Sequence, residues 1–225
     1  MVRRVERIFV WTGGALFVFA LAYGAYSYFI VWASPEPGRS SSAAVDLALF
    51  ALFAIHHTLF ARERVKRWIA ARIPPHLIRS IYVWAASLLF ILVCEQWAPI
   101  GGELYRATDG AAIAHAAVQL AGVALMALSV RRIDALELAG IRQSSGTLQT
   151  TGPYGWVRHP VYLAWMLIVF GAAHMTTDRL TFAILTSLYL VIGVVFEERS
   201  LAREYPQAYD AYTHRVRSRI IPYVY

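Results

Sequence analysis

Residues 152–160 read GPYGWVRHP and stand immediately before a long apolar stretch, residues 161–196. Proline suits the first turn of a helix, because its missing N–H would be unpaired there, and it pushes the preceding residue towards an extended conformation. The sequence therefore predicts that a helix begins at His159-Pro160. Its N-terminal N–H groups, flanked by the cations Arg158 and His159, would favour binding of an anion.

The apolar stretch is long enough to cross a bilayer twice, with a turn near residues 175–179. Each arm holds roughly 16–20 residues, about 25–30 Å at 1.5 Å per residue. The second arm ends at Glu197 and Glu198, so both carboxylates are predicted to return to the level of His159. A pair of carboxylates at a membrane boundary is costly to desolvate and should face water, a cation or a bound ligand.

The whole chain has the composition of a membrane protein. Of its 225 residues 58% are hydrophobic and 16% charged, and the mean hydropathy is +0.49. The apolar runs lack the alternation of a membrane barrel, so the predicted fold class is all-α: a polytopic membrane helix bundle with a cytosolic C-terminal helical cap. We expect about six transmembrane helices, at about residues 8–32, 44–61, 80–97, 111–130, 160–176 and 180–196.

The net charge of +7 is distributed as a topology signal. Basic loops follow the second and fourth spans, and the loop around Glu103, Arg106 and Asp109 is close to neutral. The positive-inside rule predicts that both termini and the loops after the second and fourth spans lie in the cytosol. The expected location is the inner, cytoplasmic membrane, and nucleic-acid binding is not expected. Cys94 is the only cysteine, and no metal site is expected.

The residues after the second arm add aromatic side chains at the same level. Pro206 restarts a helix on which Tyr209 and Tyr212 share one face. Each side chain alone has an ordinary explanation, as a membrane anchor, a salt-bridge partner or an interfacial tyrosine. Their clustering instead favours a binding site for a ligand that carries both charges, of which S-adenosylmethionine is one, because its sulfonium is attracted by aromatic faces.

These motifs resemble those of the membrane methyltransferases that include isoprenylcysteine carboxyl methyltransferase, the phospholipid N-methyltransferases and the methanethiol S-methyltransferases. The C-terminal pieces that match are Gly152-Pro153-Tyr154, residues 157–163, residues 197–201, Tyr209-Asp210-Ala211-Tyr212 and Ile221-Pro222. The N-terminal part is most similar to the methanethiol S-methyltransferase branch. Its matching pieces are residues 54–58, Ala61-Arg62, residues 66–68, residues 79–83 and residues 96–100.

The resemblance implies a single membrane domain of residues 1–225 that binds S-adenosylmethionine on the cytosolic side. Residues 1–130 would be the scaffold and the acceptor side, and residues 131–225 the cofactor-binding loop, hairpin and cap. The implied cofactor-binding residues are Tyr154, Arg158, His159, Tyr162, Glu197, Glu198, Tyr209 and Tyr212. The candidate catalytic residues are Arg199, which would close the pocket, and His57, which would help to deprotonate a thiol.

The sequence is compatible with more than one methyl acceptor and with two other classes of activity. The implied acceptor is a small thiol such as methanethiol or another lipophilic molecule that enters from the membrane lipids; a prenylated cysteine carboxylate or a lipid amine is the second possibility. A haem-binding isomerase would instead use His57 with His159 or His174 as axial ligands. A sterol reductase ranks third, from the tail Arg219-Ile220-Ile221-Pro222-Tyr223. The sequence does not predict the oligomeric state.

Overall fold

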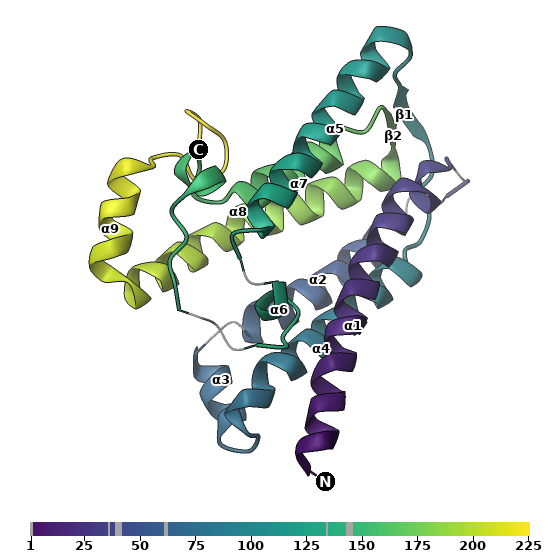
Figure 1. The fold of residues 1–225 in the computed structure, drawn as a ribbon. Coiled ribbons are helices and arrows are strands. Elements are labelled where there is room, and N and C mark those ends of the chain that lie inside the picture. Colours follow the sequence, from purple (N-terminus) through teal and green to yellow (C-terminus); the bar gives the residue numbers. More distant parts are fainter. Residues whose placement is uncertain (1, 36, 39–41, 61–62, 134, 143–145) are drawn as a thin grey trace. The chain divides into compact units, whose positions relative to one another are not determined.

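The computed structural model describes residues 2–35, 37–38, 42–60, 63–133, 135–142 and 146–225 (Figure 1). Arg62, part of the expected basic loop, lies outside them. The chain forms two compact units. The N-terminal unit comprises Met1–Gly102 with Ala135–Ser145, and the C-terminal unit comprises Glu103–Asp134 with Gly146–Tyr225.

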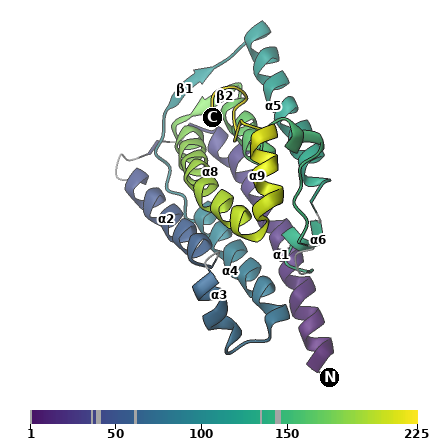
Figure 2. The same cartoon turned by 90° about the vertical axis from the view of Figure 1, so that its left-hand side faces the viewer.

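The N-terminal unit is built on two long helices, α1 and α4, that lie side by side and run in the same direction. Glu6 and His76 form an ion pair of 3.4 Å near their first turns, and the Tyr23 hydroxyl donates to Glu95 near their last turns. The helices of this unit are α1 Val2–Phe29, η1 Val31–Ala33, α2 Ser42–Phe60, α3 Glu63–Ala70, α4 Pro75–Glu95 and the short α6 Ala135–Leu138 (Figure 2).

Glycines allow α1 to approach α4 closely. A Cβ on Gly13 would lie 2.6 Å from Nε1 of Trp84, and one on Gly24 would lie 2.5 Å from Phe90. The Trp84 ring also donates to the carbonyl of Phe9 across the same contact, at 3.0 Å. Small residues thus replace side-chain bulk where two membrane helices meet.

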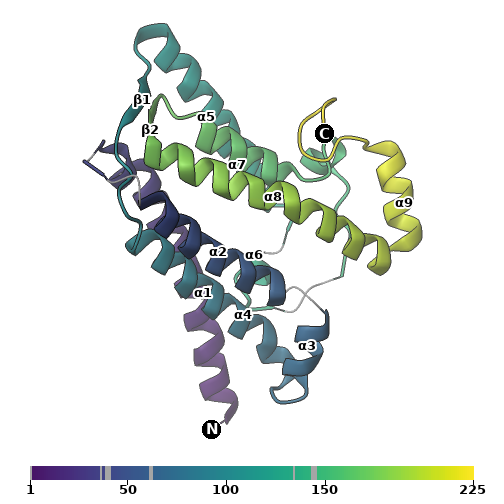
Figure 3. The same ribbon diagram turned by 180° about the vertical axis from the view of Figure 1, so that it is seen from behind.

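The C-terminal unit contains residues 152–160 and the apolar stretch that follows them. Its elements are β1 Glu103–Arg106, α5 Asp109–Val130, η2 Gly152–Gly155, α7 Pro160–Phe170, β2 His174–Thr176, α8 Thr177–Glu204 and α9 Pro206–Arg215. Helix α7 packs between α5 and α8, and Figure 3 shows α9 turning away from the end of α8. Prolines occupy the first turns of α7 and α9, as their missing N–H groups predict.

Within the residues that the structure describes, five helices are long and apolar enough to cross a membrane, and the helical membrane fold is thereby confirmed. The expected span 160–176 differs, because it is helical only over Pro160–Phe170. Polar side chains of α5 explain how a helix can end there. Gln119 donates to the carbonyl of Ile168 at 2.9 Å, and Nδ1 of His115 lies 3.3 Å from the carbonyl oxygen of Gly171. Those carbonyls therefore need no further helical turn to satisfy them.

The residues after α7 form a two-stranded antiparallel sheet that the sequence reading did not predict. β2 pairs with β1, where a near-neutral loop was expected. Side chains of both strands meet: Oε2 of Glu103 accepts from Arg106 at 2.8 Å and lies 2.7 Å from Nε2 of His174. The hairpin therefore returns through an extended strand rather than through two equal helical arms.

Candidate active site

The backbone of Arg158 and His159 is tied to the last segment of the chain. Their N–H groups donate to the carbonyls of Ser218 and Arg219, at 3.0 and 2.8 Å. The Arg158 guanidinium adds two bonds of 2.7 Å, to the carbonyls of Val216 and Arg217. Hydrogen bonds thus hold the start of α7 against residues 216–219. The two N–H groups that precede the helix are therefore engaged by protein carbonyls. The anion site expected at the first turn of α7 itself stays a prediction.

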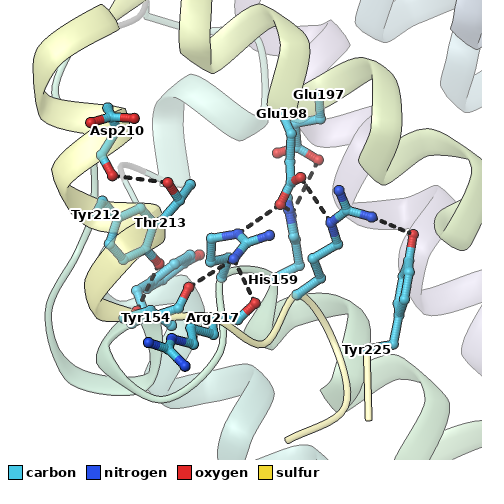
Figure 4. A network of polar contacts seen from close by, with 12 residues as sticks. Tyr154, His159, Glu197, Glu198, Asp210, Tyr212, Thr213, Arg217 and Tyr225 are labelled. Atoms are coloured by element: carbon cyan, nitrogen blue, oxygen red, sulfur yellow. Dashed lines mark hydrogen bonds and ion pairs between the residues drawn. The ribbon is translucent and has the colours of Figure 1, made fainter. Parts of the chain in front are cut away.

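Glu198 lies at the centre of a charged cluster, which we define as Arg158, His159, Glu197, Glu198 and Arg219 (Figure 4). Its Oε1 accepts from Nε of Arg158 at 2.7 Å and lies 3.4 Å from Nε2 of His159. Its Oε2 lies 3.0 Å from Nε of Arg219. The Arg158 and Glu198 side chains are only 8% and 11% exposed, so this pair is a buried ion pair.

Glu197 points to the other side of His159 and is much more open. Its Oε2 accepts from the Tyr162 hydroxyl at 2.7 Å and lies 3.6 Å from Nδ1 of His159. The His159 ring stacks on Tyr162. It lies between the two carboxylates, because Nδ1 faces Glu197 and Nε2 faces Glu198. As the hairpin argument predicted, α8 returns both glutamates to the start of α7.

Two tyrosines connect α9 and η2 to this cluster. The Tyr212 hydroxyl donates to the carbonyl of Tyr154 at 2.7 Å (Figure 4). Burial raises the pKa of Tyr212 to about 12, although the charges of Arg158 and Arg215 oppose the shift. Burial and the charge of Glu197 also raise the pKa of Tyr154. Both hydroxyls therefore keep their protons at neutral pH.

Tyr209 differs because its hydroxyl is buried without a hydrogen bond to any residue that the structure describes. The side chain is 5% exposed and its pKa is raised, first by burial and then by the charge of Glu198. A buried hydroxyl usually has a partner, and leaving one unpaired costs about 1–3 kcal/mol. The Tyr209 hydroxyl therefore lies beside Glu198 and Arg158 as a donor that lacks a well-formed hydrogen bond.

The open side of the cluster carries one group of each sign. The Glu197 side chain is 45% exposed and that of Arg219 is 37% exposed, against 8% for Arg158. The hydrogen bond with Tyr225 and the attraction of Glu198 outweigh partial burial and raise the pKa of Arg219, so this cation stays charged. A ligand that approaches the cluster meets Glu197 and Arg219 before it meets Arg158.

Arg199 is the one predicted residue of α8 that lies outside this network. It follows Glu198 by one position, about 100° round the helix. Its side chain is exposed, and its guanidinium lies over the ring of Phe196 at 5.9 Å. A catalytic role for Arg199 stays a prediction.

His57 belongs to the N-terminal unit, on α2. Its Nδ1 lies 2.6 Å from the hydroxyl of Tyr82, and its ring is near that of Phe53. The neighbouring His56 contacts the ring of Phe60, and its two ring nitrogens are buried without a hydrogen-bond partner in the described part of the chain. The two histidines therefore differ, since only His57 is oriented by a polar partner.

Two residues of these networks were missing from the sequence-based site. Arg219 was read only as part of a reductase-like tail, although it stands two residues before the matching Ile221-Pro222. Tyr82 lies in a matching segment but carried no sign of its pairing with His57, because the two residues come from different helices. Only the fold could show these contacts.

Comparisons with known proteins agree with the resemblance seen in the motifs. The sequence profile of the phospholipid methyltransferase family matches residues 113–208. Methanethiol S-methyltransferase 1 of Bradyrhizobium diazoefficiens is 31% identical, over 94% of this chain and 85% of the relative. Methanethiol S-methyltransferase of Mycobacterium tuberculosis is 31% identical, over 81% and 79%. Nurim of Rattus norvegicus, a name that states no activity, is 30% identical, over 76% and 72%.

No solved structure matches the chain significantly. The curated relatives nevertheless align over most of both sequences, and the profile match spans nearly all of α5 and the whole of α7 and α8, including four members of the charged cluster. The chain therefore belongs to the family of membrane methyltransferases that includes the methanethiol S-methyltransferases.

Proposed function

We propose that this membrane methyltransferase uses S-adenosylmethionine to methylate a small thiol, such as methanethiol, or a similar lipophilic acceptor. The names of its relatives support a thiol acceptor. The observation that carries the cofactor assignment is the charged cluster, where an open carboxylate, an open guanidinium and the buried Tyr209 hydroxyl lie at one site.

The side chains of the cluster fit the two charges of the cofactor. Arg219 and His159 would hold its carboxylate, and Glu197 would accept from its ammonium or ribose hydroxyls. Tyr209 has a buried hydroxyl that would donate to the same ligand, and Tyr162 would hold Glu197 in place. Arg158 and Glu198 would support the site without contacting the cofactor, because they hold the last segment of the chain in place. Tyr154 and Tyr212 would shape the wall.

When bound, S-adenosylmethionine supplies a methyl group that a thiolate sulfur displaces from the sulfonium, leaving the bonding electrons on the departing sulfur. The protein's part is to align the two reactants and to exclude water, which supplies much of the acceleration. His57 would take the proton of the thiol, oriented by the Tyr82 hydroxyl. Arg199 would close the cofactor pocket.

The proposal extends to the arrangement in the membrane. The basic loops support a cytosolic cofactor side, cytosolic termini and a location in the cytoplasmic membrane. We infer that residues 1–130 provide the acceptor side and residues 131–225 the cofactor side. The acceptor would then reach the site from the bilayer.

The first test is a calorimetric titration of the detergent-purified chain with S-adenosylmethionine. Glu197→Gln is the informative variant because Glu197 is half exposed, so its loss should not unfold the protein. A charged hydrogen bond is worth about 1.5–3 kcal/mol, so we expect roughly tenfold to a hundredfold weaker binding. Glu204→Gln, farther along α8, is the matched control. No binding by the folded wild-type chain would refute the cofactor assignment.

A lipid amine is the second candidate acceptor, because the family profile that matches residues 113–208 is that of the phospholipid methyltransferases. That match leaves out α1 to α4. A panel containing methanethiol, longer alkyl thiols and phosphatidylethanolamine, each with labelled S-adenosylmethionine, separates the two candidates. Methyl transfer to the lipid but to no thiol would replace the thiol assignment while leaving the cofactor assignment intact.

A further inference from the structure

A groove with a basic wall lies at one end of the N-terminal unit, away from the residues of the charged cluster in sequence. It is bounded by the first turns of α1, the start of α4 and the segment after α6, and has a volume of about 470 Å³. Its lining includes Arg3, Glu6, Arg7, Trp11, His76 and Ile141. A second hollow of about 680 Å³ shares Arg3, Arg7 and Trp11 and adds Arg4.

One side of the groove is formed by a hydrogen-bonded turn that packs against α1. Ser80 donates to the carbonyl of Gly140 at 2.8 Å, and Gly140 has φ +71°, a conformation that favours glycine. This turn presents Ile141 to α1, where a Cβ on Gly14 would lie 2.6 Å from the Ile141 side chain. The groove is therefore a packed feature of the unit rather than a gap beside a single helix.

The charge in the groove is mostly uncompensated. Its carboxylate, Glu6, is paired with His76 at 3.4 Å. Arg3 and Arg7 are one turn apart on α1, and within the described part of the chain neither makes an ion pair or a side-chain hydrogen bond. Two guanidinium groups on one face suit the oxygens of a phosphodiester, which they can bind in pairs.

The same face of α1 continues as an apolar surface. Trp11 is 56% exposed and Val18 is 62% exposed. Val18 follows Arg7 by eleven residues, about 20° round the helix and roughly 16 Å along it. An occupant with an anionic head at Arg3 and Arg7 would thus lay an apolar chain along a span suited to lipid.

We propose that this groove binds the headgroup of an anionic phospholipid, with its acyl chains along α1. Positive-inside charge alone needs neither a groove nor an adjoining tryptophan. A free phosphate would use the cations but not the apolar face of Trp11 and Val18. This lipid site shares no residue with the proposed cofactor site, and the proposal does not depend on that site.

The test uses the full-length chain purified in detergent and delipidated. Dioleoyl phosphatidylglycerol and dioleoyl phosphatidylcholine are titrated separately, and bound lipid is counted by native mass spectrometry alongside the melting temperature. The variant is Arg3→Gln with Arg7→Gln. The matched control, Arg131→Gln with Arg203→Gln, removes two exposed boundary charges elsewhere. Because each cation near an anionic lipid contributes on the order of 1 kcal/mol, we expect roughly thirtyfold weaker binding of phosphatidylglycerol in the variant only.

A second variant keeps the test decisive if removal of both charges prevents folding. Arg3→Lys with Arg7→Lys preserves the charge and the topology signal but loses the paired guanidinium donors, so weaker phosphatidylglycerol binding is expected. Equal binding of both lipids, equal loss in the control, or full binding by the Lys variant would overturn the proposal. So would the same stabilisation by inorganic phosphate, which would indicate a soluble-anion site.

Discussion

Nε of Arg158 lies 2.7 Å from Oε1 of Glu198, and both side chains are almost entirely buried. The same guanidinium holds the carbonyls of Val216 and Arg217, so the pair joins α7, α8 and the end of the chain. An ion pair placed in this way is structural as well as electrostatic. Its loss would disturb the site even if neither residue touched the cofactor.

Glu198→Ala is expected to destabilise the protein by about 3–5 kcal/mol, because it leaves the Arg158 charge buried without a counterion. Glu198→Gln should cost less, since an amide oxygen can still accept from Arg158. Equilibrium unfolding in detergent, followed by circular dichroism, measures both. Asp210→Ala, at a side chain 73% exposed, is the control and should change stability by less than about 0.5 kcal/mol. An unchanged unfolding curve for Glu198→Ala would contradict this structural role.

Stability should fall in alkaline solution as the pH rises from about 10 to about 12. The pKa of Tyr212 is raised from 10.0 to about 12 in the folded protein, so its contribution is complete below pH 10. Above that pH the unfolded chain loses the proton first, which favours unfolding until the folded-state pKa is reached. Unfolding curves recorded across this range measure the slope.

Tyr212→Phe should flatten that slope and lower stability at neutral pH by about 1 kcal/mol, because the bond to the Tyr154 carbonyl is lost. The slope should persist in part, since the pKa values of Tyr154 and Tyr209 are raised as well. Tyr223→Phe, at a residue 98% exposed, serves as the control. If stability fell equally steeply with pH in Tyr212→Phe and in wild type, Tyr212 would not contribute to the loss of stability at alkaline pH.

Gln119→Leu is expected to destabilise the C-terminal unit by about 0.6–1.7 kcal/mol, the range for hydrogen bonds between membrane helices. The Ile168 carbonyl would lose its donor at the end of α7. Unfolding in mixed micelles gives the free energy. Gln96→Leu, at an exposed side chain after α4, makes the same chemical change without that bond. Equal effects of the two substitutions would show that Gln119 does not support the end of α7.

Tyr82→Phe should reduce turnover of the thiol by roughly tenfold, if Tyr82 orients His57 for proton removal. The affinity for S-adenosylmethionine should not change, and the loss should shrink at high pH, where the thiol ionises without help. Initial rates over a range of pH test this expectation. Tyr26→Phe, at an exposed residue of α1, is the matched control. A rate equal to wild type would exclude Tyr82 as a positioning residue.

By itself, the sequence determined the class of fold and the level at which the site lies. Apolar runs of about 20 residues must become membrane helices, and Pro160 and Pro206 mark helix starts because of their backbone chemistry. The return of Glu197 and Glu198 to His159 was predicted from helix rise and is confirmed, although the first arm is completed by an extended strand. These are local properties, so they can be inferred without knowing the partners of any residue.

The tertiary structure decided the contacts that join distant segments. The spacing and hydropathy of the side chains gave no sign that α7 ends at Phe170, because that end depends on hydrogen-bond donors from α5. Nor did they indicate that Arg158 is buried while Arg219 is open, since both are arginines beside apolar residues. Which side chain meets a ligand depends on packing between segments about 60 residues apart, and sequence period carries no information on that packing.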